Sequence, residues 1–472
     1  MIRVSLSAPR PTAGRLGLVL LAAALLAGCA DSIAGKGFDE AAQTAGAALG
    51  RQPVWIRSDE DRAKAQARVA ALLQKPLDPD DAVEIALLNN RGLQARYAEL
   101  GLSAADLAQA SRLPNPGFSF KRLSSNGDLD IERQFSLDAM GVLTLPIRHA
   151  IEKRRFEQAK LKAANDILVT AANVRQAWYR AVAAQQAAVY VGQVKDAAEA
   201  RVDLARRMRR TGNWSLLDYA REQAFYAETV ARIARAKLSA AAERERLVRL
   251  LGLYGGDLAF TLPERLPDLP AALQDTGDLE ARALAERLDI RAGRAEVAGL
   301  AASLGLTRTT RVINVLETSY YRNSLSGQSR QTGYEIRLEV PLFDWGDAKV
   351  AHAEQTYMQA VDRLAEQAVN LRSELRESYG EYQTAWDLAR HYRDEIIPLR
   401  QKISDEMLLR YNGMLVSAFD LLGDAREQVD SVTEAIAAQR DFWLAETSLR
   451  FVTLADTGRP DSAPALSLAA RN

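Results

Sequence analysis

The sequence of 472 residues is poor in cysteine, histidine and aromatic residues, and neither sign of charge is in excess. It has one Cys, three His, 7% aromatic residues, and 61 basic against 61 acidic side chains. One Cys excludes an intrachain disulfide and a Cys-cluster metal site. Balanced charge argues against nucleic-acid binding, which needs a basic excess. We therefore expect a protein that is not an enzyme, with no catalytic residue, no metal site and no cofactor.

Long hydrophobic runs are also lacking, apart from a short one near the N-terminus. Residues 16–27 are small or apolar and follow three arginines, a pattern typical of a secretory signal. This core of about 12 residues is too short to span a membrane. Its ending, Leu26-Ala27-Gly28-Cys29, resembles the lipobox of bacterial lipoproteins. That resemblance implies cleavage before Cys29 and acylation of Cys29; the alternative is an ordinary signal peptide with a chance cysteine.

The first half of the chain alternates between helical and strand patterns. Apolar residues recur at helical spacing over 80–113, and Pro114-Asn115-Pro116 stops that helix. Strict apolar–polar alternation over 118–121 and again over 134–145 predicts two strands, with Asn126-Gly127 in the loop between them. We expect Pro146 to end the second strand.

Two long helices should follow these strands. From Pro146 to Gly212 there are 66 residues rich in helix formers, or about 100 Å of helix. A helix of this length does not fit within a compact domain, so it predicts coiled-coil packing. A second helix is expected from about 216 to 250.

The same order of elements is then repeated. Helix 279–304, strands 312–321 and 332–340, and helices 346–412 and 419–455 repeat the first half. The two turn glycines are 201 residues apart, and a Ser and an Asp after each are 202 apart. Pro398 should kink or end the helix in which it lies. The expected division of the chain is as follows: 1–28 lipoprotein signal peptide, 29–79 lipidated tether, 80–262 first repeat, 263–278 linker, 279–456 second repeat, and 457–472 flexible tail.

Four strands in one chain are too few to close a membrane barrel, and an open sheet would leave two edges unpaired. Strands pooled from several chains would remove those edges: two chains would supply about eight strands, and three chains about twelve. Helices of about 100 Å extending from such a barrel would form a tube.

Several motifs in this repeated framework resemble the TolC family of outer-membrane efflux channels, and specifically its lipoprotein members. The resemblance covers about residues 80–454. Four motifs, taken in order, carry it: Leu113-Pro114-Asn115-Pro116, Gly212…Ser215…Asp218, Pro341-Leu342-Phe343-Asp344-Trp345-Gly346 and Tyr411…Gly413…Ser417…Asp420.

The resemblance implies a mainly α fold with a small β part. The long helices would form an α-helical coiled-coil barrel. Each chain would also contribute four strands to a trimeric 12-stranded transmembrane β-barrel. It also implies a homotrimer, anchored by its lipid in the outer membrane and extending into the periplasm. Such a protein would be the passive duct of a tripartite efflux system for small molecules or metal ions. Its partners would be a periplasmic adaptor (membrane fusion) protein, an inner-membrane pump and outer-membrane lipid. The alternatives are a type I protein-secretion duct and a non-conducting periplasmic scaffold lipoprotein.

The candidate site residues lie at the two helical turns and on the last strand. Gly212 and Gly413 should be turn glycines that the backbone geometry requires, and the family resemblance adds adaptor contacts at these turns. Asp218 and Asp420 either cap the returning helices or line the pore entrance. The set expected at the periplasmic tip is Gly212, Ser215, Asp218, Gly413, Ser417, Asp420 and Asp424. Gly423 stands where many relatives of the family carry a second acidic residue, and Asp424 is beside it. On the last strand, Glu335, Arg337 and Glu339 should face the lumen.

Overall fold

The computed structural model describes residues 30–125, 128–212, 214–273, 277–311, 315–339 and 343–456. The predicted signal peptide, Cys29 and the tail 457–472 lie outside the described residues. The chain forms two compact units, and each takes pieces from both sequence repeats. The first unit comprises Met1–Ala41, Tyr97–Ala163 and Ala292–Leu364, and the second comprises Ala42–Arg96, Ala164–Arg291 and Ala365–Asn472.

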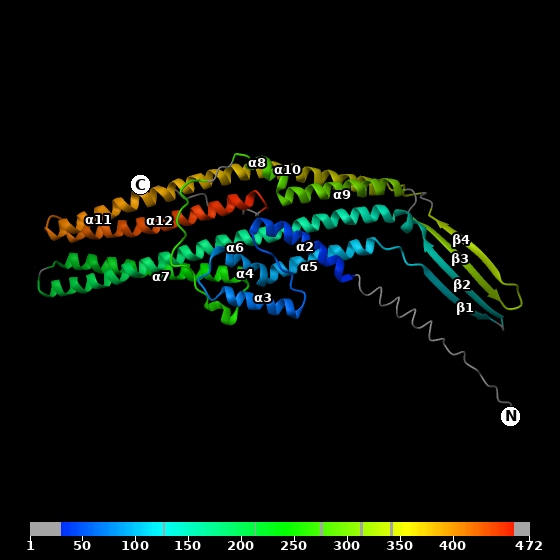
Figure 1. Cartoon of the computed structure of the whole chain (residues 1–472), viewed down its shortest axis with the longest axis horizontal. Helices are drawn as coiled ribbons and strands as arrows, with labels where there is room; N and C mark the ends of the chain where they lie inside the picture. The colour runs from blue at the N-terminus through cyan, green and yellow to red at the C-terminus, as the bar shows by residue number, and fades with distance from the viewer. Residues whose placement is uncertain are drawn as a thin grey trace, which may run out of the picture. The chain divides into compact units, whose positions relative to one another are not determined.

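The first unit contains one antiparallel sheet. Its strands are β1 (Gly117–Ser125), β2 (Asp128–Asp138), β3 (Leu316–Leu325) and β4 (Gln331–Leu338), paired in that order (Figure 1). The prediction of four strands in two hairpins is thus confirmed, and β1 and β4 are the two edges. A helix precedes β1 and another follows β2, and the same is true of β3 and β4. All four strands are therefore joined to helices at one end of the sheet, and both hairpin loops lie at the other end.

The predicted boundary of the second strand is wrong. Strand β2 ends at Asp138, and helix α6 (Ala139–Arg210) begins at once, with Pro146 inside it. The Asp138 carboxylate accepts a hydrogen bond of 2.8 Å from the Gly141 backbone N–H, as an N-capping side chain does. Alternation over 139–145 was therefore misleading, because a short apolar run fits a helix as well as a strand.

Helices complete the first unit. They are α9 (Leu288–Thr310), most of α5 (Arg91–Ala110), and the first parts of α2 (Ala30–Leu49), α6 and α10 (Asp347–His391). In α2, the Phe38 ring lies edge-on to Tyr97 with centroids 4.8 Å apart, and Gly37 leaves room for the Phe156 ring. Much of the segment predicted as a tether is therefore packed helix, because Phe38 and the alanines that follow it form an apolar face at helical spacing.

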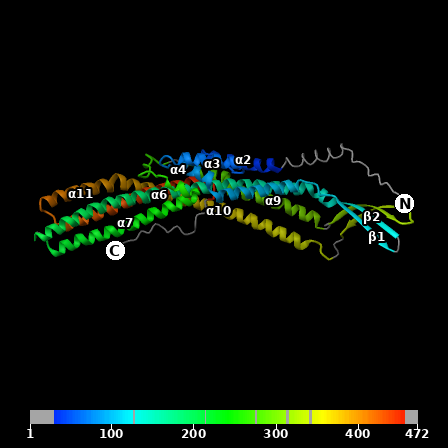
Figure 2. The same ribbon diagram turned by 90° about the horizontal axis from the view of Figure 1, so that it is seen from below.

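The second unit is built on two helical hairpins. In the first, α6 turns back as α7 (Leu216–Leu251); in the second, α11 (Ile397–Asn412) turns back as α12 (Ala418–Val452) (Figures 1 and 2). The shorter helices α3 (Asp59–Leu72), α4 (Pro79–Asn89) and α8 (Leu279–Glu286) and the 3-10 turn η1 (Gly255–Ala259) belong to the same unit.

The helix break expected near Pro398 is present. Helix α10 ends at His391, one π-helical turn follows (η2, Tyr392–Ile396), and α11 begins with Pro398 as its second residue. Proline lacks the N–H that continues the hydrogen-bond ladder, and the wider turn before it accommodates the loss.

Aromatic side chains form the core of the second unit. Trp178 of α6 is 1% exposed and donates a hydrogen bond of 2.7 Å to the Leu77 carbonyl. The Tyr179 and Trp443 rings stack 5.4 Å apart, and Phe442 lies edge-on to Trp443 at 5.1 Å. Helices α6 and α12 are therefore held together well away from their turns. Among the described residues, no helix is both long enough and apolar enough to cross a membrane.

Candidate functional sites at the helical turns and on the sheet

The turn between α6 and α7 has the geometry that its sequence predicts. Gly212 has φ +77°, a left-handed conformation that glycine adopts at little cost. Ser215 is the N-cap of α7: its hydroxyl oxygen accepts a hydrogen bond of 3.1 Å from the Asp218 backbone N–H. The same hydroxyl donates to the Asp218 carboxylate at 2.6 Å. Asp218 therefore stabilises the start of the returning helix.

The turn between α11 and α12 differs in one respect from the prediction. Gly413 has φ −79°, which any residue can adopt, and the left-handed position is Met414 at φ +60°. The expectation that Gly413 is required by its backbone conformation is wrong. This turn has one residue more between its glycine and its aspartate than the first turn has. Its left-handed position lies one step after the glycine, on the Met414 side chain, which is 93% exposed.

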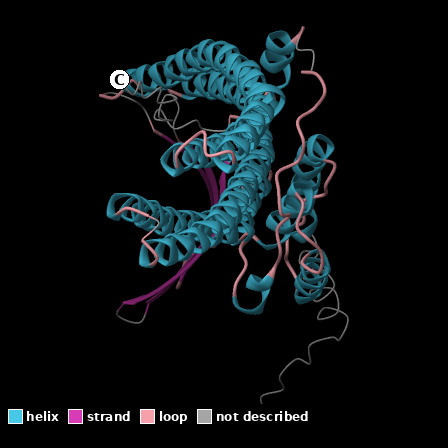
Figure 3. Ribbon diagram, turned by 90° about the vertical axis from the view of Figure 1, so that its left-hand side faces the viewer, coloured by secondary structure: helices cyan, strands magenta, loops and turns pink. Residues whose placement is uncertain are grey.

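Ser417 and Asp420 form a reciprocal capping box at the start of α12. The Asp420 N–H donates to the Ser417 hydroxyl at 3.2 Å, and the Ser417 N–H donates to the Asp420 carboxylate at 2.9 Å. The Ser417 hydroxyl's own bond to the Asp420 carboxylate and, after it, the bond from the Ser417 N–H lower the pKa of Asp420. The capping role is thus present at both turns, and a pore-lining role for either aspartate stays a prediction. Figure 3 looks onto both turns.

Asp424 belongs to α12, and its carboxylate contacts α11. Its side chain is 8% exposed and accepts a hydrogen bond of 2.6 Å from the Ser404 hydroxyl. Its other carboxylate oxygen has no hydrogen-bond partner among the described residues. Asp424 thus belongs to the packing between these helices, in contrast to the exposed Met414.

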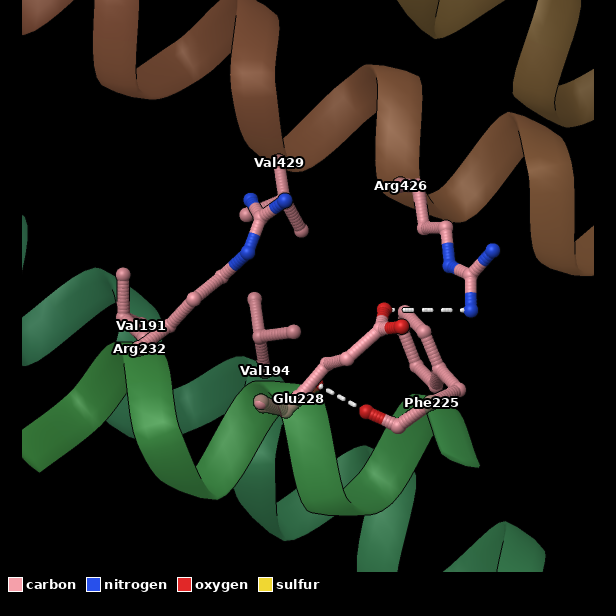
Figure 4. A pocket seen from close by; sticks show the side chains of 8 residues that line it. Val191, Val194, Phe225, Glu228, Arg232, Arg426 and Val429 are labelled. Carbon is pink, nitrogen blue, oxygen red and sulfur yellow. Dashed lines mark hydrogen bonds and ion pairs between the residues drawn. The ribbon is translucent and has the colours of Figure 1, made fainter. Parts of the chain in front are cut away.

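An ionic cluster that the sequence did not suggest joins the two hairpins. Arg426 of α12 pairs with Glu228 of α7 at 3.1 Å, and its guanidinium lies 5.5 Å from the Phe225 ring centre (Figure 4). Arg232 of α7 pairs with Asp430 of α12 nearby. The partners are about 200 residues apart in sequence, so no local spacing connects them. Both carboxylates are exposed, and the side chains of Arg232 and Arg426 are 41% and 39% exposed, so solvent screens both pairs and each contributes little to stability by itself.

Polar side chains interact across one face of the sheet. Arg337 pairs with Glu317 at 3.1 Å and with Glu335 at 3.5 Å, and the Tyr321 hydroxyl donates to Glu335. Glu339 follows β4 and is exposed. The structure therefore brings Glu335 and Arg337 together, as their alternation predicted, and adds Glu317 from the neighbouring strand.

The opposite face of the sheet is apolar. The register aligns one residue from each strand in a single aromatic row: Phe118, Phe135, Tyr320 and Tyr334. Phe118 is 71% exposed and Tyr334 is 84% exposed, and Ile336 in the next row is 62% exposed. Exposed apolar patches of this kind mark a surface that contacts a membrane, a ligand or another protein chain.

No family model matches the sequence, and no curated protein matches it. Solved structures of membrane proteins, outer membrane channels among them, do match the fold. One is a membrane protein from Pseudomonas aeruginosa, with TM-score 0.69, 18% identity and coverage of 82% of this chain and 93% of the other. The Campylobacter jejuni CmeC outer membrane channel has TM-score 0.64 and 15% identity, with 81% and 87% covered. The open state of the Neisseria gonorrhoeae MtrE outer membrane channel has TM-score 0.64 and 16% identity, with 79% and 88% covered. The chain therefore has the fold of TolC-like outer-membrane channels.

Proposed function

We propose that this chain is one subunit of an outer-membrane duct that conducts small molecules or metal ions from the periplasm to the exterior. The observation that carries the proposal is the two-faced sheet. Its apolar face is uncovered, whereas its other face carries ionic and hydroxyl groups such as Glu335 and Arg337. This is the segregation required of a strand with lipid on one side and water on the other.

The proposed assembly is a homotrimer. Strands β1 and β4 are sheet edges, and each edge leaves main-chain groups that need partners in a membrane. Pairing β4 of one subunit with β1 of the next would close a barrel of about twelve strands and remove every edge. The likeness to solved outer-membrane channels supports this assembly.

The helical hairpins would then form the periplasmic conduit, with their turns as the entrance. Leu216 and Leu217 at the first turn and Met414 and Leu415 at the second are all exposed, so both turns offer apolar surface. We place the docking of a periplasmic adaptor here, with an inner-membrane pump supplying the energy. Acylated Cys29 would anchor the chain in the same membrane.

Conductance and assembly test this function. The purified protein should form trimers that resist detergent and should give discrete conductance steps in planar bilayers. Cys29→Ala should weaken anchoring while leaving trimers and conductance intact, because the barrel holds the protein in the membrane. A monomer that is soluble without detergent after Cys29→Ala would refute the duct and favour a periplasmic scaffold.

A further inference from the structure

Three arginines on the sheet are not used by the conduction and docking proposed above. They are Arg122 of β1, Arg133 of β2 and Arg322 of β3. The register pairs Arg133 with Phe120 and Arg122 with Ile131, which places these arginines on the apolar face. They are the cations nearest the hairpin loops on that face.

Two of these arginines face each other across neighbouring strands. The register that pairs Gln134 with Tyr321 sets Arg133 opposite Arg322. Like charges directly opposite in an antiparallel pair are unfavourable unless an anion lies between them.

The sheet itself supplies no such anion. Every acidic side chain of the four strands lies on the opposite, polar face by the same register: Asp128, Asp130, Glu132, Asp138, Glu317 and Glu335. Within the described part of the chain, none of the three arginines forms an ion pair, and Arg133 has only the Phe120 ring, 5.9 Å from its guanidinium. The cations on the polar face, Lys121 and Arg337, are both paired with carboxylates.

The level of these arginines in the sheet indicates what the anion is. The aromatic row that includes Phe135 and Tyr320 is two residues, or about 7 Å, nearer the helices than Arg133 and Arg322. A row of aromatic rings with a row of cations just outside it, toward the water, marks the depth at which acyl chains meet headgroups. In the proposed orientation the hairpin loops point outward, so this depth belongs to the outer leaflet.

We propose that Arg122, Arg133 and Arg322 bind the phosphate of an outer-leaflet lipid against the outside of the barrel. The planar guanidinium groups suit phosphate because each can donate two parallel hydrogen bonds. Phe135 and Tyr320, one same-face row nearer the helices, would contact the first carbons of the acyl chains. The site rests on the proposed function, since it requires the apolar face to meet lipid.

The test measures lipid retention by the full-length purified protein. Native mass spectrometry in neutral detergent would follow the binding of phosphatidylglycerol, of a diacylglycerol with the same acyl chains, and of inorganic phosphate. We expect phosphatidylglycerol to bind most tightly. The double variant R133Q/R322Q should bind it about 30-fold more weakly, because two interfacial charges are lost. R133K/R322K should keep most of the affinity, and Arg249→Gln, an exposed arginine of α7 far from the sheet in sequence, should change nothing.

Three outcomes would overturn the lipid site. Equal binding of phosphatidylglycerol and diacylglycerol would show that the phosphate is not recognised. Binding of inorganic phosphate as tight as that of the lipid would identify a plain anion site. Unchanged binding by R133Q/R322Q would exclude these arginines. Each variant is also tested for conductance: a conducting protein without phosphatidylglycerol preference refutes only this site, whereas a wild type that neither trimerises nor conducts refutes the proposed function.

Discussion

Lysine substitutions at two neighbouring residues of strand β4 should have opposite effects: one should prevent membrane insertion, and the other should not. Ile336 lies on the apolar face and is 62% exposed, and the neighbouring Glu335 lies on the polar face, where it accepts a hydrogen bond from Tyr321. Consecutive side chains of a strand point to opposite faces. Ile336→Lys therefore places a charge in lipid, whereas Glu335→Lys places the same charge in water.

The two substitutions should differ greatly in free energy. A lysine on the lipid face costs about 2–4 kcal/mol near the bilayer midplane. Three copies in a homotrimer bring this to about 6–12 kcal/mol, which is comparable with the whole stability of a folded domain. Glu335→Lys removes one hydrogen-bond acceptor and places a cation beside Arg337, a loss of about 1–3 kcal/mol per chain without any charge in lipid.

Refolding into lipid vesicles measures the difference. Urea-denatured protein is diluted into phosphatidylcholine vesicles, and the fraction that migrates as a trimer on unheated detergent gels is followed against urea concentration. Wild type and Glu335→Lys should insert, and Ile336→Lys should remain unfolded or aggregated. If Ile336→Lys inserts as well as Glu335→Lys does, the apolar face does not meet lipid and the reasoning fails.

Three further predictions concern stability in detergent, followed by thermal unfolding or hydrogen exchange. Gly212→Ala should lower stability by about 1 kcal/mol, because its φ is +77°, whereas Gly413→Ala should have little effect at φ −79°; equal losses would contradict this difference. Trp178→Phe leaves a buried carbonyl without its donor and should cost about 1–3 kcal/mol, so an unchanged melting temperature would show that this bond is dispensable. The pKa of Asp420 is lowered in the folded state. Its contribution to stability is therefore fully present above the ordinary Asp pKa and is lost as the pH falls through the lowered value. Ser417→Ala should abolish this acid dependence of amide protection in the first turn of α12, and its persistence would assign the dependence to another group.

Periodicity and proline position were enough to predict most elements. The long uninterrupted helices and the strands β3 and β4 follow from residue spacing, because helices and half-buried strands impose different apolar periods. The helix break near Pro398 follows from the missing N–H of that residue, whereas its π-helical form was known only from the structure. The same signals failed over 139–145, where a capping aspartate decided between helix and strand.

The site residues were predicted unevenly for a related reason. Ser215 and Ser417 could be identified as caps because a capping bond joins residues three apart in sequence. The pairs Arg426–Glu228 and Arg232–Asp430 could not, because α7 and α12 approach each other only after both hairpins have formed. The left-handed φ of Met414 could not be predicted either, because methionine rarely adopts it and the geometry of the whole turn imposes it.

The sequence by itself determined that this protein has two repeats, each with a hairpin of strands and a hairpin of long helices, since each element depends on near neighbours in the chain. Only the tertiary structure decided which faces meet. It set Arg133 opposite Arg322, gathered the strand carboxylates on one face and brought the Asp424 carboxylate of α12 into contact with α11. The physical reason is that register and helix packing are fixed by contacts between residues far apart in sequence, which no local pattern records.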